Sequence, residues 1–269
     1  PYAETIGASF LGFSDAYADQ WVRERAGACA SKSREVERCL QRRLGDLDRL
    51  VRVFESPDRN LVEHALDLAE RLDTPSICRS APGREDNPIS EEVRNLLDYA
   101  ELKVASGEFQ GARELLIQLH DAGSRSRAVR ARLLYLDGWI SASSAPDRRS
   151  DQQLDEAMWA AASIVDADTY ARAATYRLQS LVHDLGHVNE AEALERSIES
   201  TTAWWPDDTP AKWRFKADYA EARGSRRELA GDMRGAILDR VVALVLRVLR
   251  HGEGHPSVAK AHHNFAATL

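Results

Sequence analysis

The stretch GEFQGARELLIQLHDAG (107–123) joins a glycine turn to an amphipathic helix, and two other stretches of the chain share this design. They are GHVNEAEALERSIEST (186–201) and GDMRGAILDRVVALVLRVLR (231–250). In all three an alanine follows the glycine by five residues; these alanines are Ala112, Ala191 and Ala236. Because the distance between packed helices depends on side-chain size at the contact, small residues there let two antiparallel helices approach closely. The recurrence predicts a stack of helix pairs.

The same alternation of helix and turn continues from about residue 90 to the end of the chain. Apolar periodicity and turn residues predict four helix pairs and the beginning of a fifth. The expected helices cover 91–106, 108–123, 126–143, 152–165, 168–185, 187–201, 210–230 and 232–250, with a last one from 255 onward. The array resembles the tetratricopeptide repeat. Its last two turn glycines are 45 residues apart, compared with a period of roughly 34 in that family.

The N-terminal part of the chain is also helical in pattern. The loop RSAPGREDNPIS (79–90), rich in Pro, Gly and charge, separates it from the array. We therefore predict an all-α protein with a short N-terminal helical bundle at 1–78. A tetratricopeptide-like α-solenoid of antiparallel helix pairs follows at 90–269, and its last repeat is incomplete.

The stretch CLQRRLGDLDRL (39–50) is the clearest amphipathic helix of the N-terminal block. Its apolar residues recur at helical spacing and are expected to form one buried stripe. The members of this stripe are Leu40, Leu44, Leu47, Val51 and Phe54.

Composition and charge narrow the classes of partner. The chain is 43% hydrophobic with a net charge of −7, so nucleic acid is not expected as a partner. The longest apolar run, Val241–Leu246, is too short to span a bilayer. Membrane contact is expected only through a segment outside this chain. The chain starts at Pro1 and stops inside a helical pattern, so we expect it to be part of a longer protein.

Linear motifs of catalysis are missing from the sequence. It contains no glycine-rich phosphate loop, H-R-D, D-F-G, G-x-S-x-G or H-E-x-x-H. We predict a non-catalytic chain without a cofactor. Four residues have metal-like spacing: His183, Asp184, His187 and Glu190. Because Gly186 falls at a turn between the two histidines, they should not share a helix face, and no metal site is predicted.

The N-terminal block carries a more specific pattern of Trp…Cys…Cys-Leu-x-Arg-Arg-Leu, closed by a further cysteine. The matching residues are Trp21, Cys29, Cys39, Leu40, Arg42, Arg43, Leu44 and Cys78. With this pattern, followed by helical repeats, the chain resembles the C-terminal region of serine/threonine protein kinases from myxobacteria and related bacteria. The ending GEGHPSVAKAHHNFAATL (252–269) resembles kinesin-light-chain-like repeats. The chain departs from the family at ASKSREVE (30–37), where a Gly-Glu-Gln-Ser-like stretch is usual.

The resemblance implies a function in protein recognition. It suggests the sensor, scaffold or substrate-recruiting part of a kinase whose catalytic domain is not in this chain. A partner would be a protein or peptide, held as an extended or helical segment in the concave groove of the array. Similar kinases often carry a membrane helix before this region, so the resemblance leaves open which side of a membrane the domain occupies.

The three cysteines allow two interpretations. They can be small buried apolar residues. Alternatively, Cys29 and Cys39 form a disulfide, which requires the chain to bend near residues 30–33 because one straight helix cannot bring the two thiols together.

Candidate partner-binding residues come from the first helix of each pair, which lines the groove in the repeat family. They are Tyr135, Trp139, Tyr176, Gln179 and Asn264. Two tryptophans in the loop before residue 210 are added as a potential recognition patch: Trp204 and Trp205. Each of these aromatic residues could equally pack between repeats.

Two other classes of function stay open from the sequence. The array could bind a small molecule as the sensing domain of a transcriptional regulator. It could also be an assembly domain that self-associates through the incomplete repeat at 255–269.

Overall fold

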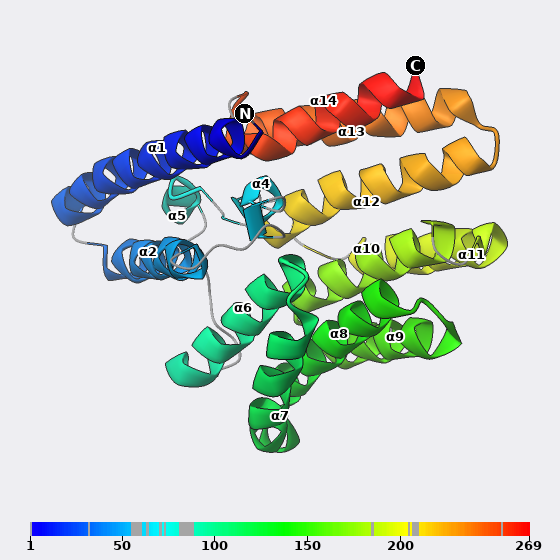
Figure 1. Ribbon diagram of the computed structural model, residues 1–269, viewed down its shortest axis with the longest axis horizontal. Coiled ribbons are helices and arrows are strands. Elements are labelled where there is room, and N and C mark those ends of the chain that lie inside the picture. Colours follow the sequence, from blue (N-terminus) through cyan, green and yellow to red (C-terminus); the bar gives the residue numbers. More distant parts are fainter. Residues whose placement is uncertain are drawn as a thin grey trace. The chain divides into compact units, whose positions relative to one another are not determined.

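The computed structural model is helical in all its regular elements (Figure 1). It describes residues 2–31, 33–54, 61–62, 65–69, 72, 74–80, 89–183, 186–203, 205, 210–253 and 255–269. The chain divides into two compact units. Unit 1 comprises Pro1–Pro88, Ala105–Glu108 and Gly254–Ser257, and unit 2 comprises Ile89–Val104, Phe109–Glu253 and Val258–Leu269. Among the described residues no helix is long and apolar enough to cross a membrane.

Unit 1 is built on an antiparallel pair of helices, α1 (Tyr2–Ser31) and α2 (Arg34–Val53). Ser33 caps α2 by accepting a hydrogen bond from the Val36 backbone N–H. The two helices are linked by pairs whose numbers run in opposite directions: Tyr17 with Arg43, Trp21 with Leu40, and Arg25 with Glu37. The short helices α4 (Ala65–Ala69) and α5 (Ile77–Ser80) pack against α1 and α2, respectively.

The buried face of α2 differs in part from the expected stripe. Leu40 is buried as expected, but Val51 is 46% exposed. Leu50 and Val53 are buried in place of Val51. The predicted stripe is wrong at its C-terminal end. Apolar residues occupy adjacent positions there, and only packing decides which of them faces inward.

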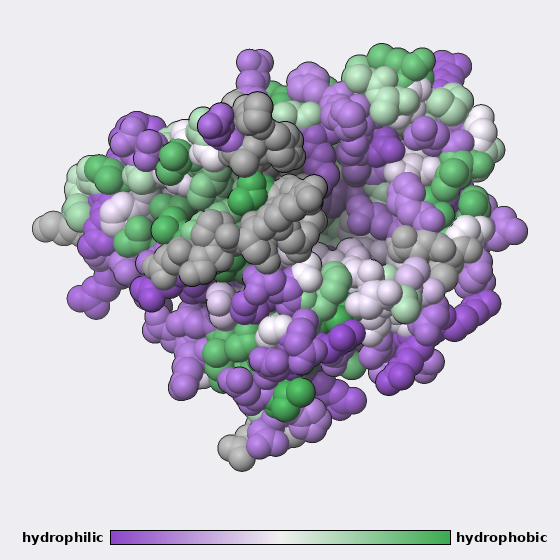
Figure 2. Space-filling view, viewed as in Figure 1, coloured by the Kyte–Doolittle hydropathy of each residue, from purple (hydrophilic) through white to green (hydrophobic). Residues whose placement is uncertain are grey.

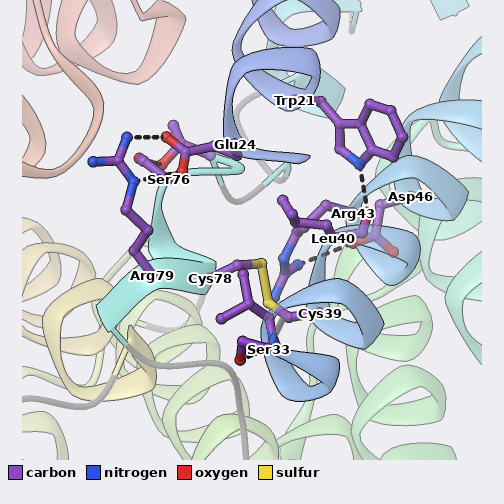
Figure 3. Close-up of a disulfide and its surroundings, with 12 residues drawn as sticks. Trp21, Glu24, Ser33, Cys39, Leu40, Arg43, Asp46, Ser76, Cys78 and Arg79 are labelled. Carbon is purple, nitrogen blue, oxygen red and sulfur yellow. Dashed lines mark hydrogen bonds and ion pairs between the residues drawn. A yellow bond between two sulfur atoms is a disulfide. The ribbon is translucent and has the colours of Figure 1, made fainter. Parts of the chain in front are cut away.

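A disulfide joins Cys39 of α2 to Cys78 of α5 within a buried cluster of unit 1 (Figure 3). Their Cα atoms are 5.6 Å apart, and both residues are almost fully buried. Ala28 and Leu40 pack around the bond, and Trp21 contacts the same cluster from α1. The indole N–H of Trp21 donates to the Leu40 carbonyl at 2.6 Å. An ion pair between the buried Glu24 carboxylate and Arg79 ties α1 to α5 beside the disulfide.

Neither interpretation of the cysteines holds: Cys39 and Cys78 are buried but bonded to each other, and the alternative Cys29–Cys39 disulfide is wrong. The chain does turn between α1 and α2, but Cys29 is exposed and free. The reason is helical phase: Tyr17, Glu24 and Ala28 form the buried side of α1, spaced by seven and four residues. Cys29 is one residue beyond Ala28, which rotates its side chain about 100° away from α2.

Unit 2 consists of consecutive antiparallel helix pairs. The helices are α6 (Glu91–Ala105), α7 (Phe109–Arg125), α8 (Arg127–Ser144), α9 (Arg148–Ala162), α10 (Ala167–His183), α11 (Val188–Thr202), α12 (Pro210–Leu229), α13 (Met233–His251) and α14 (Pro256–Thr268). They confirm the helices expected after residue 90. Each helix from α7 to α12 packs on the next one, and α10 also packs on α8 and α12. This is a solenoid-like arrangement, in which α6, α8, α10 and α12 are the first helices of successive pairs and α14 follows the last pair.

The turn glycines and the alanines that follow them behave as the sequence predicts. Gly107, Gly186 and Gly231 have φ values of 79°, 66° and 80°, a conformation that favours glycine. The alanines five residues later are fully buried. Gly138 provides a further close approach, because a Cβ placed there would meet the Leu154 side chain at 2.9 Å. Small residues thus set the spacing between paired helices.

Replacing both disulfide cysteines (Cys39→Ala with Cys78→Ala) should destabilise unit 1. For a sequence separation of 39, the loss of chain constraint corresponds to roughly 4 kcal/mol. Hydrogen exchange of the α2 amides should therefore accelerate strongly. Cys29→Ala is the matched control and should leave exchange in α2 unchanged. Equal acceleration in the two variants would contradict the assigned pairing.

Candidate functional site

A ladder of alternating charges crosses the first helices of unit 2. It runs from Asp98 (α6) to Arg132 (α8), Glu101 (α6), Arg172 (α10), Asp168 (α10) and Arg214 (α12). The Arg132 guanidinium lies 2.8 Å from Asp98 Oδ1 and 3.3 Å from Glu101 Oε2. We call these six residues the first-helix ladder. It connects four successive first helices without leaving an unpaired charge among its members.

Because the carboxylate of Glu101 is buried, it needs charged partners more than an exposed carboxylate would. The side chain of Glu101 is only 10% exposed, and it accepts hydrogen bonds from both Arg132 and Arg172. Burial alone would lower the pKa of Arg132, but the carboxylates of Asp98 and Glu101 outweigh it and raise that pKa above the ordinary arginine value. The guanidinium therefore stays charged and fixed between α6 and α8.

An aromatic cluster occupies the neighbouring part of α8 and α10. The rings of Tyr135 and Trp139 stack with centroids 5.7 Å apart, and the Trp139 ring lies 5.3 Å from that of Tyr176. Tyr135 and Trp139 are buried, whereas Tyr176 is half-buried. The Tyr176 hydroxyl forms a 2.6 Å hydrogen bond with the exposed Ser143 hydroxyl. We call the two buried rings of Tyr135 and Trp139 the aromatic floor. The hydroxyl groups of Tyr176 and Ser143 lie beside it at the protein surface.

One face of α10 brings the ladder and the cluster together. Asp168, Arg172, Tyr176 and Gln179 are spaced by four, four and three residues, so they share a side of the helix. All four are half-buried. We call these four residues the polar strip of α10. Gln179, one of the candidates from the sequence, thus lies next to Tyr176 on this strip.

The remaining candidates from the sequence lie elsewhere. Trp205 is half-buried, and its ring contacts those of Tyr170 and Phe215 at 5.6 and 5.4 Å. Trp204 lies outside the described residues. Asn264 of α14 donates to Glu221 Oε1 at 2.6 Å. Of the six candidates that the structure describes, Tyr135, Trp139, Tyr176 and Gln179 are brought together.

Glu221 is the centre of a second buried network. Arg240 of α13 and Asn264 of α14 bind its Oε1, and Arg247 of α13 binds its Oε2. Arg247 also reaches Asp218 at 3.2 Å. This network connects the last helices of unit 2, as the first-helix ladder connects the earlier ones.

The structure describes three of the four residues of the histidine group near Gly186, namely His183, His187 and Glu190. His187 Nδ1 lies 3.4 Å from Glu190 Oε1 at a shallow hollow lined by residues 186–190. His183 is exposed at the end of α10, and Asp184 lies outside the described residues. Within the described part of the chain, no three His, Cys, Asp or Glu side chains could hold a metal ion together.

Sequence reasoning missed the charged members of this site. Arg132 and Arg172 each lie five residues after the first residue of their helix. This shared position is a weak signal of a repeated arginine. Their carboxylate partners are as many as 71 residues away in the chain. No local pattern identifies such pairs.

Comparison with known proteins does not assign this arrangement to a family. No protein-family model, no curated protein and no solved structure matches the chain. Its function is therefore inferred from its own residues.

The Glu221 network should be sensitive to loss of one charge. Glu221→Gln leaves Arg240 and Arg247 buried without their shared carboxylate, which should cost about 3 kcal/mol of the free energy of unfolding. Denaturant titration of the chain measures this cost. Glu228→Gln is the matched control on α12. Its carboxylate is 39% exposed and lies 3.6 Å from Arg240, so the effect should be below about 0.5 kcal/mol. Equal costs for the two variants would contradict a central role for Glu221.

Proposed function

We propose that this chain is a non-catalytic repeat domain, of the tetratricopeptide-like kind, that binds a protein or peptide segment. The polar strip on α10 supports the proposal most directly. Tyr176 and Gln179 offer a hydroxyl and an amide at the surface, beside the floor of Tyr135 and Trp139. An amide side chain and a hydroxyl can pair with the backbone groups of a bound segment.

The charges of the ladder indicate what kind of segment this is. Its three arginines and three carboxylates pair with one another and cancel in net charge. The ladder therefore contributes no single-sign field that would select a strongly acidic or basic ligand. The proposed ligand is a segment with an apolar or aromatic anchor near Tyr176 and backbone groups within reach of Gln179.

The proposed setting is a bacterial serine/threonine kinase, in which this domain acts as sensor, scaffold or substrate-recruiting part. The support is the resemblance in the N-terminal block together with its structural coherence. Trp21, Cys39, Leu40 and Cys78, all residues of the family pattern, meet in one buried cluster (Figure 3). A disulfide in that cluster fits an oxidising compartment, which a membrane helix in a longer protein would make accessible.

Crosslinking with mass spectrometry tests the binding face. The immobilised chain is exposed to lysate of the source organism, and crosslinked peptides are identified for the wild type and for Tyr176→Ala with Gln179→Ala. We expect a discrete foreign segment crosslinked to α8 and α10 in the wild type. Its yield should fall at least about tenfold in the variant, corresponding to about 1.4 kcal/mol of binding free energy.

Trp159→Ala is the matched control for this experiment. Trp159 is 52% exposed on α9, the second helix of its pair, and should not affect capture. Equal loss with Trp159→Ala, or crosslinks that avoid α8 and α10 altogether, would contradict the proposed face. Turnover of a small molecule by the chain would contradict the non-catalytic assignment.

A further inference from the structure

Helix α13 has an unusual distribution of side chains. Its buried residues include Asp239, Arg240 and Arg247, which are 2%, 8% and 8% exposed. Its exposed side is instead apolar: Leu238, Val241, Val242, Val245 and Leu249 are 38–71% exposed. We call these five residues the α13 stripe. Figure 2 shows apolar side chains at the upper right, in the part of the view where Figure 1 draws α13 together with the end of α14.

The polar side of α13 is already satisfied within the chain. Arg240 and Arg247 bind Glu221, and Asp239 binds Arg223 and Arg227 of α12. These pairs fix the rotation of the helix, so the apolar side cannot turn inward without breaking them. Large apolar stripes on a protein surface mark interaction sites.

The stripe has a symmetry that indicates its partner. Leu238, Val242, Val245 and Leu249 are spaced by four, three and four residues, and both spacing and residue type read the same in the two chain directions. These are the a and d spacings of a coiled coil. An antiparallel copy of the helix would place Leu238 opposite Leu249 and Val242 opposite Val245, twice over. A two-fold interface requires such self-complementarity.

We propose that the α13 stripe binds the α13 stripe of a second copy of this chain, forming an antiparallel two-fold dimer. Charge supports this register. The one charged residue on the exposed arc of α13, a helix described along its whole length, is Arg234 in its first turn. The register brings Arg234 to the C-terminal end of the partner helix, close to the exposed Glu253 of that copy. A cation at that end is favourable to the helix dipole.

The size of the stripe sets the strength of the dimer. Its five side chains expose on the order of 400 Å² of apolar surface per copy. Two copies bury about 800 Å², less than the ~1,200–2,000 Å² of stable interfaces. The half-buried Ile237, Leu244 and Val248 at its edge add to this area. The dimer is therefore expected to be concentration-dependent, with a dissociation constant of about 1–100 µM.

Analytical ultracentrifugation of the full 269-residue chain from about 1 to 500 µM tests the dimer. The wild type should shift from monomer to twice the monomer mass. Val242→Asp and Val245→Lys, each alone, should weaken the dimer more than tenfold. The combined variant should recover dimerisation, because the register places the introduced aspartate of one copy opposite the introduced lysine of the other at two symmetric positions.

Ile117→Asp is the control for the general effect of a surface charge. Ile117 is 74% exposed on α7, away from the α13 stripe, and this variant should dimerise as the wild type does. Circular dichroism confirms that each variant is folded. If the wild type stays monomeric over the whole concentration range, the dimer proposal is wrong. The α13 stripe would then be a binding surface for a different protein. Failure of the combined variant to recover overturns the antiparallel register, and so does equal weakening by Ile117→Asp.

Discussion

Charge pairing between helices is the constraint on which unit 2 depends. Glu101 is nearly buried and is shared by arginines from two other helices, and Glu221 is shared by two arginines of α13. An ion left alone in such a place costs several kcal/mol, so each partner fixes the position of the others. The first helices therefore cannot slide past one another without exposing or stranding a charge. The polar strip on α10 owes its position to this constraint, because Arg172 belongs to both the ladder and the strip.

The same constraint leads to the apolar surface of α13. Because Asp239, Arg240 and Arg247 pair with residues of α12, the exposed side of α13 beyond its first turn consists of valine and leucine. Recognition in this chain is thus proposed on two surfaces of different chemistry. The first helices offer hydrogen-bonding groups over an aromatic floor, and α13 offers an apolar, self-complementary stripe. A dimer through α13 would carry two copies of the polar strip on α10. A partner with two binding segments would then bind its second segment at a raised effective concentration.

The array helices could be predicted from the sequence because their signals are local. Glycine turns, the alanine five residues later and apolar periodicity all lie within one helix pair. The cysteine pairing could not be predicted, because Ala28 and Cys29 differ by a single helical step and only packing shows which one faces α2. The first-helix ladder could not be predicted from the sequence either, since Glu101 and Arg172 are 71 residues apart in the chain. The spacing of Tyr135 and Trp139 places them on a first helix, but it does not reveal that both are buried. In α13 apolar residues occupy every side of the helix, so the outward face could be identified only from the partners of its buried Asp239, Arg240 and Arg247.

A double-mutant cycle on Glu101 and Arg172 tests the central claim that the ladder couples successive first helices. The free energy of unfolding is measured for the wild type, Glu101→Gln, Arg172→Met and the double variant. We predict a coupling energy of about 1–3 kcal/mol, as for residues in one buried network. The same cycle on the exposed pair Arg148 and Glu190, whose side chains are 76% and 44% exposed, should give less than about 0.5 kcal/mol. A coupling energy near zero for Glu101 and Arg172 would contradict the account, because the first helices would then be held by apolar packing alone.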